Sequence, residues 1–257
     1  MDKLYMILLC LMIVPILICI KYSRKIKSDV ASSIVKCLIF AIVTILSNGL
    51  SAFSGNETFS YIMEALYRFS FDLMLIYVLQ YSQQYTRVFH EVSPFKKGCF
   101  IIAYLDGILL FLNIIFHNVF TIETVRFPNF DMYHVADKSI IFYVHYVFAY
   151  GLVVCIIASF IIKIIQIPDF YRKKYLPILV LMCVITVSKF ICGILEFPID
   201  VSLPFFVCAA ILICYLTLYR SPRELVDKTL SIVVTEMNNA VTVSYTHLRA
   251  HETSAHL

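Results

Sequence analysis

The chain has 257 residues, of which 61% are hydrophobic and 15% are charged, and its net charge is +4. Only about half of the residues of a soluble domain are apolar, so this composition, with a mean hydropathy of +0.86, excludes an ordinary soluble protein. The basic residues lie at the edges of apolar stretches rather than in one basic patch, and we therefore predict no nucleic-acid partner.

Seven apolar stretches of helical length follow one another along the chain. A helix needs roughly 20 residues to cross about 30 Å of hydrocarbon, and continuous rather than alternating apolar runs exclude a β-barrel. We predict an all-α membrane protein, a bundle of seven transmembrane helices in contact with the lipid bilayer. The predicted spans are Leu4–Ile20, Ile34–Phe53, Tyr61–Tyr81, Cys99–Phe116, Ser139–Ile162, Tyr175–Leu195 and Ser202–Tyr219.

Lysine and arginine are concentrated in alternate gaps between these stretches. The gaps after the first, third, fifth and seventh stretches hold Lys21, Arg24, Lys25, Lys27, Arg87, Lys96, Lys97, Lys163, Arg172, Lys173, Lys174, Arg220 and Arg223. The opposite side holds only Lys3, Arg126 and Lys138. Because basic residues favour the cytoplasmic side, we predict a multi-pass protein of the cell membrane with its N-terminus outside and its C-terminus in the cytoplasm.

The third stretch carries three charged residues four positions apart. Glu64, Arg68 and Asp72 therefore share one helix face. A charge at the bilayer centre costs roughly 2.5–3.5 kcal/mol, so this face should point into the bundle. Lys189 in the sixth stretch is predicted near the depth of Arg68, which makes one neutral network of two acids and two bases. Two interpretations stay open: the network fixes helix packing, or these four residues bind an unknown small-molecule ligand.

Two further features are a buried acid in the fourth stretch and one long outer loop. Asp106 has His145 as a possible partner, although their predicted depths differ; the interpretations are a lone protonated acid or a proton relay. The loop His117–Lys138 is the only long outer loop and is rich in aromatic residues. We expect it either to cover a pocket in the outer half or to lie against lipid.

Motifs for catalysis or metal binding are absent from the sequence. The nine cysteines lie in or at the ends of apolar runs, without CxxC spacing, and predict neither disulfides nor a zinc site. No glycine-rich phosphate loop, HExxH or GxSxG motif occurs. We therefore predict no cofactor, no metal ligand and no catalytic residue, and we do not expect this chain to be an enzyme.

The segment after the seventh stretch has the pattern of a new helix. Ser221–Glu224 reads Ser-Pro-Arg-Glu, which suits a helix start. Val226, Leu230, Val233 and Met237 follow at heptad-like spacing. Two interpretations are open: a short amphipathic helix on the membrane, or a dimerising helix in which these four residues transmit a signal to a further domain.

The last residues of the chain have an unusual composition. Val243–Thr253 resembles a translated sequencing adapter of the transposon type, and we expect Val243–Leu257 not to be biological. The natural protein is then expected to continue past Thr242, and the histidines of the tail carry no functional weight.

Two segments resemble the seven-helix N-terminal region of bacterial histidine kinases. One is Phe71–Tyr81, an apolar run that ends in an aromatic residue, and the other is Phe197–Phe206, with Asp200 and Pro204 at the start of the last span. The resemblance covers nearly all of Met1–Arg220. It implies the membrane-embedded sensory input module of a bacterial signal-transduction protein, of histidine kinase or diguanylate cyclase type, truncated before its output domain.

The resemblances to the sensor region and to a sequencing adapter together imply a division of the chain into three parts. Residues 1–220 form the sensor domain, 221–242 form a cytoplasmic linker helix and the start of a truncated domain, and 243–257 form the adapter-derived tail. Thr235–Val241 resembles the opening of a PAS domain. We expect a homodimer through the C-terminal helix. The alternative is a small seven-helix transporter, in which paired broken helices are expected near the midplane.

Overall fold

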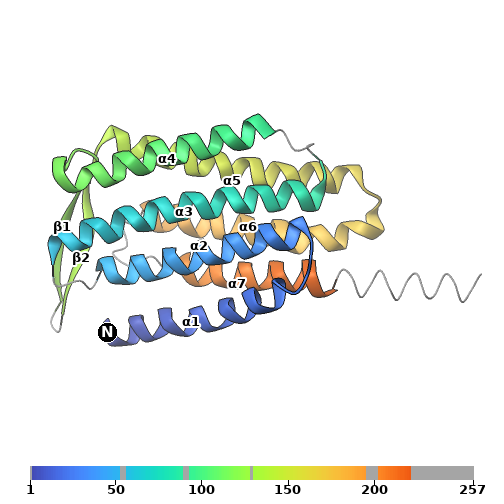
Figure 1. Ribbon diagram of the computed structural model, residues 1–257, viewed down its shortest axis with the longest axis horizontal. Helices are drawn as coiled ribbons and strands as arrows, with labels where there is room; N and C mark the ends of the chain where they lie inside the picture. Colours follow the sequence, from blue (N-terminus) through green and yellow to red (C-terminus); the bar gives the residue numbers. More distant parts are fainter. Residues whose placement is uncertain (1, 53–55, 89–92, 128–129, 195–201, 221–257) are drawn as a thin grey trace, which may run out of the picture. The chain divides into compact units, whose positions relative to one another are not determined.

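The computed structural model describes residues 2–52, 56–88, 93–127, 130–194 and 202–220. These residues form seven α-helices, two strands and a short π-helix (Figure 1). The elements are α1 (Asp2–Ser23), α2 (Asp29–Ala52), α3 (Glu57–Thr86), α4 (Ser93–Phe116), β1 (Phe120–Phe127), β2 (Phe130–Lys138), α5 (Ile140–Gln166), α6 (Asp169–Ile194), α7 (Ser202–Cys214) and η1 (Tyr215–Arg220). The chain divides into two compact units, Met1–Cys214 and Tyr215–Leu257. The second contributes only η1 to the described residues.

The seven predicted apolar stretches coincide with the seven α-helices of the described chain. Four of these helices, α2, α4, α5 and α6, are long and apolar enough to cross a membrane. The apolar helical segments Ile7–Ser23 and Phe205–Leu218 are shorter. Helices of this length and composition are typical of a membrane protein.

Helix α3 is the longest helix among the described residues and lies at the centre of the first unit. It packs against α2, α4 and α5, and more than half of its residues are buried (Figure 1). Asn56 caps its start, where the side chain accepts a hydrogen bond from the Phe59 backbone N–H. At its end Arg87 adopts the left-handed conformation, with φ of 52°, and its N–H donates to the Gln83 carbonyl. Both ends of the central helix are therefore defined by local hydrogen bonds.

Helices α4 and α5 direct large apolar side chains away from the protein. The exposed ones include Ile101, Leu105, Ile108, Ile115, Val144, Val147, Val154 and Ile165. The opposite face of α4 lies close to α3, because a Cβ added at Gly107 would lie only 2.5 Å from Phe69 Cδ2. The absence of a side chain at Gly107 thus permits the close approach of the two helices.

The segment between α4 and α5 corrects the prediction of an all-α fold with an irregular outer loop. It folds into an antiparallel hairpin in which Ile122 pairs with Val135 and Phe127 pairs with Phe130, with a register shift between Phe120 and Ile122. The physical reason lies in the local sequence. Phe-Thr-Ile-Glu alternates apolar and polar residues, and Phe120–Val125 is rich in β-branched side chains, which favours a strand.

The hairpin is attached to the end of the bundle at which α3 begins (Figure 1). The Ile122 N–H donates to the Tyr61 hydroxyl at 3.0 Å. Asn113 at the end of α4 accepts from the Val119 N–H at 2.7 Å and donates to the Phe120 carbonyl at 2.8 Å. A cluster of buried side chains fills the junction: Tyr61, Ala65, Leu110, Val119, Phe120, Ile122 and Phe142. The hairpin is therefore part of the packed core of this unit.

Candidate functional site

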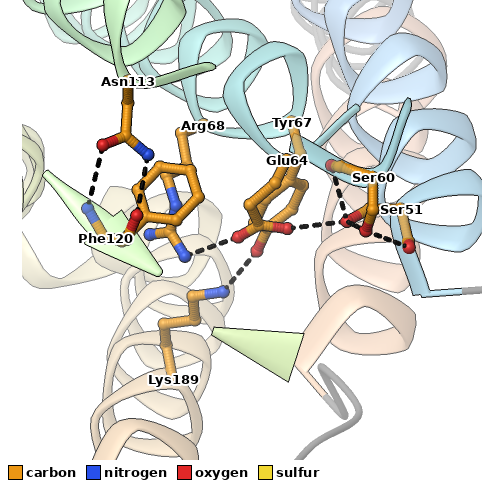
Figure 2. A network of polar contacts seen from close by, with 8 residues as sticks. All are labelled: Ser51, Ser60, Glu64, Tyr67, Arg68, Asn113, Phe120 and Lys189. Carbon is orange, nitrogen blue, oxygen red and sulfur yellow. Dashed lines mark hydrogen bonds and ion pairs between the residues drawn. The ribbon is translucent and has the colours of Figure 1, made fainter. Parts of the chain in front are cut away.

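Two clusters of polar side chains lie inside the first unit, and both include charged residues of α3. The Arg68 cluster consists of Ser51, Glu64, Tyr67, Arg68 and Lys189. Arg68 Nη2 donates to Glu64 Oε1 at 2.6 Å, and their side chains are only 8% and 10% exposed (Figure 2). Ser51 Oγ donates to Glu64 Oε2 at 3.2 Å. The prediction that Glu64 and Arg68 face the interior is confirmed.

Aromatic rings surround the guanidinium group of Arg68. Its Cζ atom lies 4.3 Å from the ring centroid of Phe142 and 5.5 Å from that of Phe120. The rings of Tyr67 and Tyr146 lie at 5.9 and 6.0 Å. A cation over an aromatic face gains roughly 0.5–2 kcal/mol, which offsets part of the loss of hydration. Because Phe120 belongs to the hairpin, the hairpin itself helps to hold this buried charge.

Lys189 connects α6 to the same cluster. Its Nζ donates to the Tyr67 hydroxyl at 2.7 Å, as Figure 2 shows, and lies 5.5 Å from the Tyr67 ring centroid and 5.3 Å from that of Phe71. Tyr67 is adjacent to Arg68 in the sequence. The structure therefore places Lys189 near Arg68, one of the residues predicted to share a network with it.

The His145 cluster consists of Asp72, Asp106 and His145, from α3, α4 and α5. His145 Nδ1 lies 2.7 Å from Asp106 Oδ2, within hydrogen-bond distance, and 3.3 Å from Asp72 Oδ2. The structure thus brings Asp106 and His145 together, despite their different predicted depths. It also divides the predicted network, because Asp72 lies beside His145 and not with Glu64, Arg68 and Lys189.

The carboxylate of Asp72 is the least compensated polar group in the His145 cluster. Its side chain is 0% exposed, and among the described residues neither of its oxygens has a hydrogen-bond partner. The approach of His145 at 3.3 Å is an ion-pair distance without hydrogen-bond geometry, since Nδ1 is bonded to Asp106. A buried carboxylate in this state is costly unless a cation or a proton compensates it.

A shallow apolar crevice between α2, α3 and α7 is a third feature of this unit. It is lined by Ala41, Thr44, Ile45, Phe71, Met74, Phe206 and Val207. Phe71 and Phe206 meet edge to face across it, with ring centroids 5.4 Å apart. Its described lining offers no charged group, so it does not suit a charged ligand.

Several sequence predictions fall outside the described residues. Val226, Leu230, Val233 and Met237, the predicted signal-transmission residues, belong to 221–257, as do the linker helix and the tail. The segment from Phe197 to Val201, which carries part of the family resemblance, also lies outside the described residues.

The sequence did not predict several residues that form or surround the Arg68 cluster. Tyr67 could have been found, because it lies three positions after Glu64 and so near the same helix face. Phe142 and Tyr146 could not, because they reach Arg68 from another helix whose apolar surface gives no sign of which face is inward.

Comparison with known proteins adds no family. No protein-family model matches the sequence, and no curated protein is significantly similar to it. The resemblance of Phe71–Tyr81 and Phe197–Phe206 to the sensor region of bacterial histidine kinases therefore stays a prediction.

Proposed function

We propose that the chain is the membrane-embedded sensory input module of a bacterial signal-transduction protein, with seven spans and its N-terminus outside. In this proposal an output domain of histidine kinase or diguanylate cyclase type follows the seventh helix. One observation carries it: the hairpin between α4 and α5 contributes Phe120 to the aromatic surroundings of Arg68 on the central helix. A segment outside the membrane is thereby packed directly onto the helix that runs through the bundle.

The distribution of lysine and arginine along the chain supports the proposed orientation of the hairpin. The gap that holds the hairpin is one of those poor in basic residues, whereas Arg87, Lys96, Lys97, Lys163 and Arg172–Lys174 lie in gaps on the other side. The hairpin then faces the outside and the far end of α3 faces the cytoplasm. The contact between Ile122 and Tyr61 agrees with this arrangement, since both lie on the side poor in basic residues.

The proposed mechanism is a two-state equilibrium of the helices. A ligand that binds the hairpin side better in one arrangement shifts the population toward it. Coupling of this kind is typically about 1–3 kcal/mol, comparable to the contacts that Phe120 and Phe142 make with Arg68. The bond between Lys189 and Tyr67 would carry the shift from α3 to α6.

The transporter alternative has less support from the described helices. Transporters with inverted repeats bind their substrates at helices that are broken near the midplane. Here α1 continues through Pro15 and α6 through Pro177, and α2 to α5 are continuous over their described lengths. Continuous helices favour a receptor.

Reporter fusions test the orientation. Enzymes that are active only outside the cytoplasm are fused after Lys27, Asn129, Lys173 and Arg223. We expect activity only for the fusion after Asn129, which lies in the hairpin segment. Activity of any of the other three would contradict the seven-span orientation.

A chimera tests the receptor. Met1–Asn239 is joined to a cytoplasmic kinase or cyclase that requires dimerisation, and output is measured after Phe120→Leu. We expect altered output, because the ring that touches Arg68 is lost. Phe116→Leu is the matched control, since Phe116 is 65% exposed and should leave output unchanged.

Insertions after Lys228 provide a second readout from the same chimera. Each inserted residue rotates a helix by about 100°, so insertions of one to four residues should change output and seven should restore it. Output that changes neither with Phe120→Leu nor with insertion length would favour the transporter. Substrate uptake by liposomes that contain the protein would favour it as well.

A further inference from the structure

Three potential metal ligands from three helices converge inside the bundle. Asp72, Asp106 and His145 each offer one ligand atom, and these atoms lie within 4.8 Å of one another. They come together because α3 packs against both α4 and α5. Asp72 and His145 are buried, and the side chain of Asp106 is 10% exposed.

The charges of this cluster do not balance. With a neutral imidazole, Asp72 and Asp106 carry two negative charges in a region of low dielectric constant. Arg68 lies one helical turn from Asp72, about 6 Å along the axis, but it is bonded to Glu64 at 2.6 Å. Both oxygens of the fully buried Asp72 lack a hydrogen-bond partner among the described residues. The site therefore needs two units of positive charge next to that carboxylate.

We propose that Asp72, Asp106 and His145 bind a divalent first-row transition-metal ion of the zinc type. The carboxylates of Asp72 and Asp106 and Nδ1 of His145 would be its three protein ligands, and a fourth position would stay open. A divalent ion with two carboxylates and a neutral imidazole has no net charge, which suits the interior of a membrane bundle. The proposal goes beyond the receptor function and does not depend on it.

The donor set and the spacing support this class of ion. Imidazole and carboxylate together suit zinc and its first-row neighbours, whereas magnesium and calcium prefer oxygen ligands alone. Ligand atoms at about 2.0–2.2 Å from a tetrahedral zinc ion are roughly 3.4 Å apart. His145 Nδ1 is 3.3 Å from Asp72 Oδ2, which already fits, and 2.7 Å from Asp106 Oδ2, so this second pair must move apart when the ion binds; all three ligand atoms lie within 4.8 Å of one another. A bound ion would cross-link α3, α4 and α5.

Metal binding to the purified full chain tests the proposal. The protein is made without a polyhistidine tag, with His247, His251 and His256 changed to alanine so that the tail cannot bind metal. It is stripped with a chelator in detergent micelles and then titrated with Zn²⁺, Co²⁺ or Mg²⁺. We expect about one tightly bound Zn²⁺ or Co²⁺ ion per chain and no saturable Mg²⁺ binding.

Variants assign the ion to this site. Asp72→Asn and His145→Gln should each weaken Zn²⁺ binding about tenfold or more. Glu57→Gln is the control, since it removes an exposed acid from the first turn of the same helix and should leave Zn²⁺ binding unchanged. Retained binding in the double variant Asp72→Asn/His145→Gln would overturn the proposal.

A measurement on the chain with an intact site covers the case in which these variants fail to fold. X-ray absorption of the Zn²⁺-loaded protein should show one imidazole and otherwise oxygen ligands. A shell with sulfur, with more than one imidazole or with oxygen alone would overturn the proposal. So would less than stoichiometric binding, which would mean that protons neutralise the cluster.

Discussion

The two polar clusters of α3 lie on one helix face but differ in how their charges are compensated. In the Arg68 cluster each charged group contacts a partner from the protein: Glu64 meets Arg68 and Ser51, and Lys189 meets Tyr67. In the His145 cluster two acids share one imidazole, and Asp72 has no hydrogen bond among the described residues. The protein itself compensates the charges of the first cluster, whereas in the second Asp72 lacks a hydrogen bond among the described residues.

The neighbours of each turn of α3 cause this difference. At the level of Arg68, the hairpin and α5 supply the rings of Phe120 and Phe142. One turn farther along, α4 and α5 supply Asp106 and His145. A repeated four-residue spacing on one helix therefore produces two different chemistries, because the facing elements change along its length.

The largest expected loss of stability comes from disrupting the ion pair of the Arg68 cluster. Arg68→Met leaves Glu64 buried without its partner, which typically costs about 3–5 kcal/mol. Thermal unfolding in detergent micelles should show a much lower transition temperature than for the unaltered protein. The double variant Arg68→Met/Glu64→Gln should recover most of this loss, because no charge then stays uncompensated. A double variant as unstable as Arg68→Met would mean that the aromatic contacts of Arg68, and not its ion pair, dominate.

Gly107, at the contact of α3 and α4 beside the His145 cluster, should be the next most sensitive position. Gly107→Ala places a Cβ against the Phe69 ring, and overpacking of this kind costs about 1–3 kcal/mol. Because Gly107 follows Asp106 directly, the same change should also weaken the convergence of Asp106 with Asp72. Unfolding in micelles measures the first effect, and Zn²⁺ affinity measures the second.

Gly151→Ala is the control for this substitution. Gly151 lies on α5 with nothing within 4 Å of an added Cβ, and alanine favours a helix over glycine by up to about 1 kcal/mol. We expect unchanged or slightly higher stability. Equal losses at the two positions would mean that Gly107 is not a specific contact of α3 and α4.

The sequence predicted the helices and the inward face of α3, for physical reasons that particular residues illustrate. Continuous apolar runs identified the seven helices, and the spacing of Glu64, Arg68 and Asp72 predicted an inward face, which the burial of all three confirms. Because these three charged side chains would be costly in lipid, α3 is rotated about its axis so that they face the bundle interior.

The remainder of the site depends on information that the sequence does not display. Helices α4 and α5 are apolar on nearly all sides, so their sequences do not show that Asp106 and His145 point to the same place. The grouping of Asp72 with Lys189 relied on charge and depth, but depth alone does not tell which neighbour faces a side chain. The hairpin was missed because its short alternating pattern lies between long helices, where a loop is the ordinary expectation.

The smallest effects, and the sharpest test of the division into two clusters, come from three double-mutant cycles. If Asp72 belongs with His145, combining Asp72→Asn with His145→Gln in metal-free protein should give a coupling of roughly 0.5–2 kcal/mol. If Lys189 belongs with Tyr67, Asp72→Asn and Lys189→Met should be additive within about 0.5 kcal/mol, whereas Tyr67→Phe and Lys189→Met should couple. The four single and three double variants are compared by unfolding in the same micelles. The sequence alone, which placed Asp72 and Lys189 in one network, predicts the reverse order for the first two pairs. Strong coupling of Asp72 with Lys189 and none with His145 would therefore restore the single network and remove the basis for a separate cation site.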